Sequence, residues 1–145
     1  ETTINDVPVK RYQPGLFETL DAEGKRFAVL LNEDGSYVTR ENGAKRGTKV
    51  RMFASGLGQT NPALNTNYAG IAGQSVLAKV VIGVNNAGVP VVAAETMPGV
   101  VGVYMVTFDL PADTAAGPSR PFAIAIFPED GGSLIFGNPS EIPVQ

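Results

Sequence analysis

Glycine and proline interrupt the chain throughout and exclude a helical fold. Seventeen glycines and eleven prolines are spread over 145 residues. Glycine in a helix costs backbone entropy, and proline lacks the amide donor and clashes with the preceding turn. Between these breaks lie short runs rich in Val, Ile, Phe and Tyr, which are typical of β-strands. The sequence therefore predicts an all-β protein.

Three segments alternate in polarity and predict half-buried antiparallel strands. They are residues 48–55, with Val50, Met52 and Ala54 on one face; residues 102–111, with Tyr104, Val106, Phe108 and Leu110; and residues 120–128, with Phe122, Ile124 and Ile126. Segments 76–84 and 89–95 are more uniformly apolar, which predicts central strands covered on both faces. Further strands are expected at 26–31, 36–39, 133–137 and 141–144.

Turn signals lie between several of these segments. Asp34-Gly35 within 32–37, the stretch 84–89 and the stretch 129–133 each predict a hairpin turn. About eight to ten short strands at this spacing indicate a single Ig-like antiparallel β-sandwich domain over residues 1–145.

The composition excludes several classes of function. Charged residues make up 17% of the chain, against about 25% in a typical soluble domain. Nine of the eleven Lys and Arg residues lie in 1–51 beside eight acids, so no basic stripe for nucleic acid forms. The chain has no Cys and no His, which removes zinc sites, haem ligation and Ser-His-Asp chemistry. We expect no enzyme, no cofactor, no metal and, without a long apolar run, no membrane span.

The stretch "MFASGLGQTNPA" (52–63) superficially suggests a phosphate-binding glycine loop. A dinucleotide fingerprint needs a third glycine at position 61 and a helix after it, but Asn61 and Pro62 follow instead. Gly56 is therefore expected to mark the end of a strand. Residues 56–75 then form an irregular crossover that is long enough to be of functional interest.

Four motifs occur in order along the chain. They are "QPGLFE" (13–18), "FAVLLNEDGSYVTREN" (27–42), "KRGTKVRMFASGLGQTNP" (45–62) and "MPGVVGVYMVTFDLP" (97–111). This series resembles the Solibacter-type C-terminal domain, an uncharacterised domain of large secreted acidobacterial proteins, although Ser55 stands where Thr is usual. The resemblance implies an Ig-like sandwich outside the cell and supplies no catalytic residues.

The titratable residues favour structural roles. The pairs Glu33/Asp34 and Glu129/Asp130 lie in predicted turns, where solvation explains them. A surface calcium site using Asp21, Glu23, Asp34 or the 129–130 pair stays open as an alternative. Lys79 is expected at a strand edge with its ammonium in water, in preference to an isopeptide crosslink.

The N-terminal segment "ETTINDVPVKRY" carries Ile4, Val7, Val9 and Tyr12 ahead of the resemblance. Pro8 excludes a central strand but permits an edge strand. The segment therefore pairs with its own sheet or adds to a neighbour by β-augmentation. Because the chain begins at Glu1, we expect an excised domain or a mature secreted product.

These observations lead to two functional hypotheses. The first is a secreted structural protein of the cell surface that self-assembles into a pilus-like filament or array. Residues 2–12 are the expected donor strand, and the edges near 141–144 or 76–84 are the expected acceptors. The alternative is an accessory module of a larger secreted protein that holds a glycan or cell-wall polymer. This module would use the 56–75 loop, through Gln59, Asn61 and Tyr68.

Overall fold

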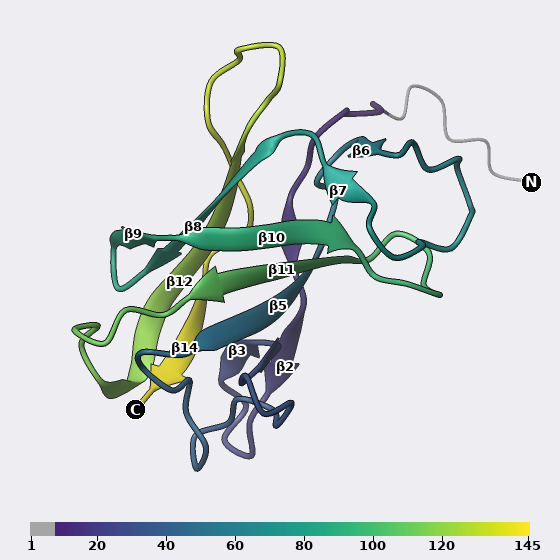
Figure 1. Ribbon diagram of the computed structural model, residues 1–145. Coiled ribbons are helices and arrows are strands. Elements are labelled where there is room, and N and C mark those ends of the chain that lie inside the picture. The colour runs from purple at the N-terminus through teal and green to yellow at the C-terminus, as the bar shows by residue number, and fades with distance from the viewer. Residues whose placement is uncertain (1–7) are drawn as a thin grey trace, which may run out of the picture.

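The strands form two antiparallel sheets that pack face to face (Figure 1). The computed structural model describes residues 8–145. Sheet 1 has the order β1-β5-β11-β10-β7-β6, with β4 also on β5. Sheet 2 has the order β13-β12-β8-β9, with β14 also on β12, and β2 and β3 form a separate hairpin.

The bounds of the strands are as follows. Sheet 1 contains β1 (Gly15–Leu16), β4 (Leu30–Leu31), β5 (Lys49–Ser55), β6 (Thr60–Asn61), β7 (Ser75–Val76), β10 (Val91–Thr96) and β11 (Tyr104–Asp109). Sheet 2 contains β8 (Lys79–Val84), β9 (Ala87–Val89), β12 (Gly117–Phe127), β13 (Ile135–Phe136) and β14 (Ser140–Val144). The hairpin consists of β2 (Glu18–Leu20) and β3 (Arg26–Ala28).

The predicted all-β sandwich is confirmed. Residues 8–145 contain no helix, and all of their strand pairs are antiparallel. Nine of the fourteen strands in this part of the chain have three residues or more, and the other five have two. The number of longer strands lies within the expected eight to ten, although not every expected segment is one of them.

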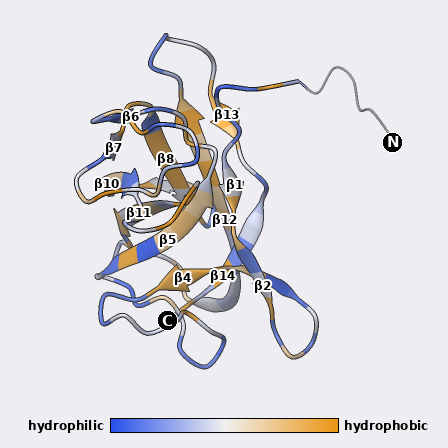
Figure 2. Cartoon of the chain, turned by 90° about the vertical axis from the view of Figure 1, so that its right-hand side faces the viewer, coloured by the Kyte–Doolittle hydropathy of each residue, from blue (hydrophilic) through white to orange (hydrophobic). Residues whose placement is uncertain are grey.

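The core lies between the two sheets and is built from the predicted faces. Val50 and Met52 of β5 and Phe108 of β11 are fully buried on the inner face of sheet 1. Ile124 of β12 is fully buried opposite them, and the rings of Phe108 and Phe122 lie 5.8 Å apart across the interface. Figure 2 shows the hydrophobic residues along the strands and the hydrophilic ones mainly in the loops. Each such side chain contributes about 1.5–3 kcal/mol on burial.

Three sequence expectations are wrong in detail. The segment 36–39 is not a strand, because after the Asp34-Gly35 turn Tyr37 makes a single bridge to Leu31. The segment 26–31 divides at Val29 into β3 and β4, which lie in different sheets.

The third error concerns the two apolar segments 76–84 and 89–95. The second of them divides at Pro90 into β9 and β10, which lie in different sheets, and neither segment is covered on both faces. Val92 is 51% exposed and Leu77 is 43% exposed. In a two-layer sandwich each strand has one face toward the core, and no further layer covers the outer face within residues 8–145.

Gly56 and Gly58 mark the exit of β5, as expected, and the structure supplies the reason. Both have left-handed backbones, with φ of 68° and 90°. A β-carbon on Gly56 would overlap the carbonyl of Gln13, and one on Gly58 would overlap the ring of Tyr12. The glycines are therefore required by the N-terminal segment that crosses over them.

We expect Gly58→Ala to destabilise the protein more than Gly73→Ala. Gly73 is also left-handed, at φ 82°, but a β-carbon there meets no atom within 4 Å. Gly73→Ala should lower the free energy of unfolding by about 1–2 kcal/mol, from backbone strain alone. Gly58→Ala should add about 1–3 kcal/mol for the displaced ring. Urea denaturation measures both, and equal losses would contradict this role of Tyr12.

Candidate functional site

Pro90 divides the hairpin that follows β8. Asn85 and Asn86 have φ of 51° and 64°, as a two-residue hairpin turn requires, so the predicted turn is confirmed. β9 pairs with β8 from Val84 to Ile82. Pro90 has no amide donor, and the chain then crosses to sheet 1, where β10 pairs with β11. β8 and β10 consequently diverge from the β9 end (Figure 1).

The divergence leaves an open edge on each sheet. Within residues 8–145, β8 pairs with β9 only at 82–84, so residues 79–81 have no partner strand on the side away from β12. In the same described part of the chain, β7 pairs with β10 only at Glu95, so residues 91–93 of β10 have no partner strand on the side away from β11. Both edges line one open groove of about 610 Å³. We call it the docking groove; its walls include Val80, Val81, Val91, Val92, Ala93 and Phe127.

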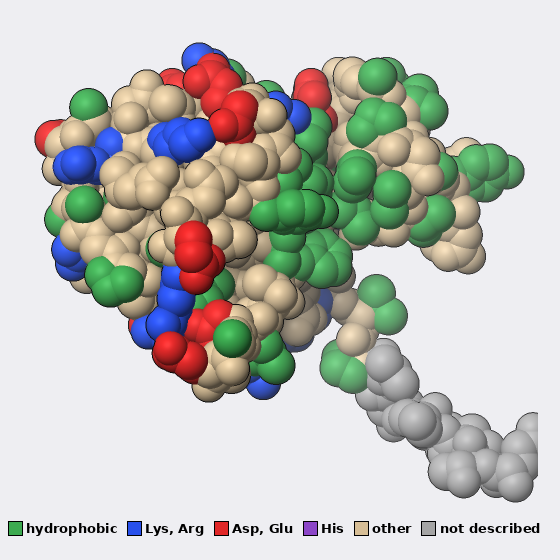
Figure 3. Space-filling view, turned by 90° about the horizontal axis from the view of Figure 1, so that it is seen from below, with side chains coloured by type: hydrophobic (Ala, Val, Ile, Leu, Met, Phe, Trp, Pro, Cys, Tyr) green, Lys and Arg blue, Asp and Glu red, His purple; other side chains and the backbone are tan. Residues whose placement is uncertain are grey.

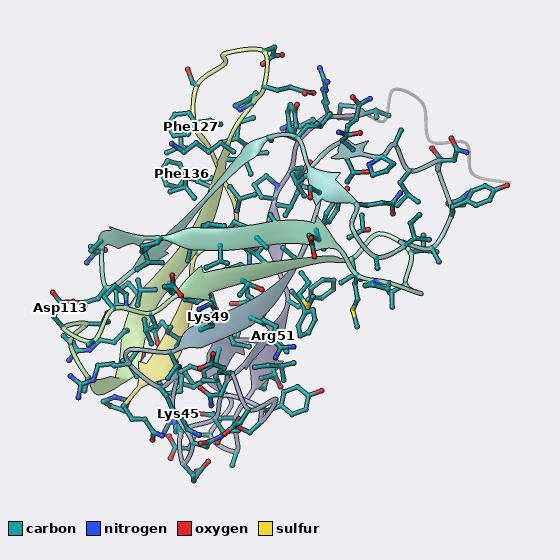
Figure 4. All side chains as sticks on the ribbon, in the orientation of Figure 1. Lys45, Lys49, Arg51, Asp113, Phe127 and Phe136 are labelled. Atoms are coloured by element: carbon teal, nitrogen blue, oxygen red, sulfur yellow. The ribbon has the colours of Figure 1, made fainter. Side chains whose placement is uncertain are left out.

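The docking groove is apolar and partly exposed. Val92 is 51% exposed and Phe127 is 42% exposed. Among the described residues that line the groove, only Lys79 is charged, and its ammonium lies 6.0 Å from the centre of the Phe127 ring. Lys79 thus occupies an exposed strand position. Phe136, which is 68% exposed, projects beside Phe127 from the outer face of sheet 2 (Figure 4).

The second expected acceptor edge, near 141–144, is not open. Ala44 donates to the carbonyl of Pro143 at 2.8 Å and accepts from the amide of Gln145 at 3.0 Å. A bridge also joins Ala44 to Val144. The chain after the 39–42 turn therefore covers this edge, which corrects that part of the prediction.

Charge is distributed unevenly along the chain and over the surface. Residues 52–108 contain two charged residues, Lys79 and Glu95. Figure 3 shows the charged side chains on one part of the molecule and hydrophobic ones over the block at the right, where the loops beside β6 and β7 lie. Most residues of the docking groove belong to this nearly uncharged part of the chain. The scarcity of charge in residues 52–108 is visible in the sequence, but strand prediction does not use it.

The N-terminal segment is fixed at Arg11 and Tyr12. Arg11 forms an ion pair with Glu129 and donates to Gln59 Oε1 at 3.1 Å. Tyr12 is 7% exposed, and its hydroxyl donates to Glu129 Oε1 at 3.3 Å. Tyr12 therefore holds the segment to its own domain.

The remaining donor residues lie before this anchor. Val9 is 96% exposed, and residues 8–12 form no strand. Ile4 and Val7 lie outside the described residues. Within the described part of the segment, pairing with the chain's own sheet does not occur.

The 56–75 crossover contains a second candidate site. Gln59 and Tyr68 line a pocket of about 530 Å³, together with Asn65, Asn67 and Tyr104. We call this the loop pocket. Asn61 does not line it; it belongs to β6 and pairs with Ser75, whereas its neighbour Thr60 does line the pocket. The structure thus brings two of the three predicted binding residues together.

Gln74 holds the loop in place and was missed by sequence reasoning. Its side chain is buried, and Oε1 accepts from the amide of Ile71 at 2.9 Å and from Thr96 Oγ1 at 3.0 Å. Nε2 donates to the carbonyls of Pro62 and Ala63, both at 3.4 Å. A polar residue in an irregular segment gives no periodic signal, so its burial could not be predicted.

Four of the predicted carboxylates form ion pairs with Lys or Arg side chains, namely Asp21, Glu23, Asp34 and Glu129. Asp21 and Glu23 both pair with Arg40 at 2.8 Å, and Asp34 pairs with Lys45 at 2.7 Å. The Lys45 ammonium and the Ser36 hydroxyl hold the pKa of Asp34 well below its usual range. Among residues 8–145 no three Asp or Glu side chains come together in a group that could hold a metal ion.

The comparisons with known proteins give no relative. No protein-family model, no curated protein and no solved structure matches the chain. The resemblance to the Solibacter-type domain therefore stays a prediction. In residues 8–145 no helix is long and apolar enough to cross a membrane.

Tyr104 gives a pH-dependent test of the packing at the loop pocket. Its half-buried hydroxyl donates to the carbonyl of Gly58 at 2.6 Å, and burial raises the pKa of Tyr104 above 10.0. A raised pKa means that the neutral form stabilises the fold below about pH 10 and that this contribution is lost at higher pH. Urea denaturation between about pH 9 and pH 11 should show a smaller decline in Tyr104→Phe than in the wild type. The exposed control Tyr37→Phe should decline like the wild type, and equal slopes in all three proteins would contradict the assignment.

Proposed function

We propose that the protein is a non-enzymatic structural protein of the cell exterior. In this proposal it assembles when the N-terminal segment of one copy adds as a strand to the docking groove of the next. The observation that carries the proposal is the pair of open sheet edges, 79–81 and 91–93, on either side of one apolar groove. The extracellular location is supported by the resemblance to a secreted domain.

Unpaired strand edges favour addition of another strand. They present amide and carbonyl groups that an incoming backbone can pair with, as in β-augmentation. Lys79 lies at one end of the groove, Pro90 at its narrow end, and a register shift interrupts β10 between Val91 and Ala93. Such features oppose indiscriminate edge-to-edge pairing. They leave a short apolar stretch that suits a short donor.

The sequence of residues 2–10 fits this groove chemically. Ile4, Val7 and Val9 are apolar, and Asp6 supplies an acid for Lys79. Pro8 has no backbone N–H, so the donated strand can form a complete set of hydrogen bonds along only one of its two edges. Ten residues before Arg11 reach up to about 33 Å when extended, which is enough to cross to a neighbouring molecule.

A neighbouring copy is the proposed recipient for a physical reason. Val9 is 96% exposed and therefore gains almost nothing from its own domain, whereas Arg11 and Tyr12 fix the base of the segment. Donor and groove are different surfaces, so the contact is head-to-tail. Such a contact propagates as a fibre unless its rotation closes a ring.

Deleting residues 1–10 should abolish assembly and leave the monomer folded, because Arg11 and Tyr12 remain. Val92→Lys should also abolish it, because it places a charge in the docking groove at a side chain that is already 51% exposed. Val101→Lys is the matched control, at 53% exposure and outside the groove, and it should assemble like the wild type. Light scattering with chromatography over a concentration series, together with negative-stain microscopy, gives the oligomeric state.

Two results would contradict the proposal. One is a wild-type chain that stays monomeric at every concentration. The other is assembly that survives both the deletion and Val92→Lys. If the N-terminal segment of the wild type binds the groove of its own chain, the wild type will be a compact monomer. A labelled peptide of residues 1–10 detects this case, because it would bind the truncated protein and not the wild type.

A further inference from the structure

The loop pocket is built by a segment that is longer than its connection requires. Two-residue strands β6 and β7 pair with each other, and antiparallel neighbours need a connection of about two to five residues. Here residues 62–74 intervene. Loops of this kind on a rigid sheet commonly carry binding residues. The extra length therefore calls for a function.

The loop is fixed in place by buried polar contacts. Gln74 joins it to Thr96 of β10 at 3.0 Å. Gly70 donates to the carbonyl of Val100 at 3.0 Å and accepts from the amide of Gly99 at 2.8 Å, which holds the loop against the 97–102 turn. A β-carbon on Gly70 would overlap Thr96. A pocket held this way loses little conformational entropy when a ligand binds.

The side chains that line the loop pocket favour a particular kind of ligand. None of the lining residues in the described part of the chain is charged. Gln59, Asn65 and Asn67 contribute side-chain amides, each with donor and acceptor capacity, although Gln59 Oε1 already accepts from Arg11. Tyr68 is 65% exposed and offers a ring face beside Val101, which is 53% exposed.

We propose that the loop pocket binds a neutral oligosaccharide, with the Tyr68 ring against a sugar face and the amides hydrogen-bonded to hydroxyl groups. A charged ligand would find no charged side chain in the described lining, and a purely apolar ligand would leave the amides unpaired. The volume of about 530 Å³ lies within the range of about 300–1,000 Å³ of small-molecule sites. This site does not depend on the proposed assembly.

The test is an NMR titration of the amide signals of the full chain carrying Val92→Lys. The probes are cellotetraose, maltotetraose and chitotetraose, with tetragalacturonate as the charged counterpart. We expect saturable shifts at Gln59, Asn65, Asn67 and Tyr68 with at least one neutral probe. Tyr68→Ala should raise Kd about tenfold or more. Tyr37→Ala removes a tyrosine that is equally exposed, at 65%, but outside the pocket, and should leave Kd unchanged.

Three outcomes would overturn the proposal. They are no saturable shift with any neutral probe, equal binding by Tyr68→Ala and Tyr37→Ala, or binding of tetragalacturonate as tight as that of the neutral probes. Because the readout is taken on a single chain, it is independent of whether the wild type assembles. Failure here would therefore leave the assembly proposal standing, and the reverse also holds.

Discussion

The missing amide of Pro90 is the constraint on which the arrangement of the two sheets depends. With a residue that has an amide donor at that position, the β8–β9 hairpin could extend over 79–81 and 91–93. The backbone groups of these two segments would then hydrogen-bond to each other. Instead β10 crosses to sheet 1 and pairs with β11, while β8 stays with β12. Every open sandwich has edges, but here two of them face each other, because they come from one divided hairpin.

The N-terminal anchor, Arg11 and Tyr12, lies next to the loop pocket. Tyr12 packs over Gly58, and the hydroxyl of Tyr104 donates to the carbonyl of the same residue. Arg11 contacts Gln59, which also lines the loop pocket. Strand exit, donor base and pocket therefore share one short stretch of backbone. Gly58 and Gln59 lie within the nearly uncharged part of the chain, residues 52–108, where an exposed apolar groove is compatible with association.

Local patterns predicted the sandwich well, and long-range contacts account for what they missed. Alternation placed Val50, Phe108 and Ile124 in the core, because side chains of a strand alternate between faces whatever the strand pairs with. It did not show that 89–95 changes sheet at Pro90, since both halves are equally apolar. Nor did it show that Ala44 covers the 141–144 edge, or that Gln74 is buried. Each of these depends on residues distant in sequence. The three predicted binding residues show the same limit, because Gln59 and Tyr68 line the loop pocket and Asn61 does not.

The central claim is that the edges 79–81 and 91–93 are unpaired in one molecule and become paired by the N-terminal segment of another. Amide hydrogen exchange of the chain lacking residues 1–10, with and without a peptide of residues 1–10, tests it most directly. The account predicts fast exchange at both edges without the peptide and slower exchange at one or both edges when the peptide is bound, with 122–126 protected throughout. Protection of both edges before the peptide is added, or no change when it is present in excess, would contradict the account.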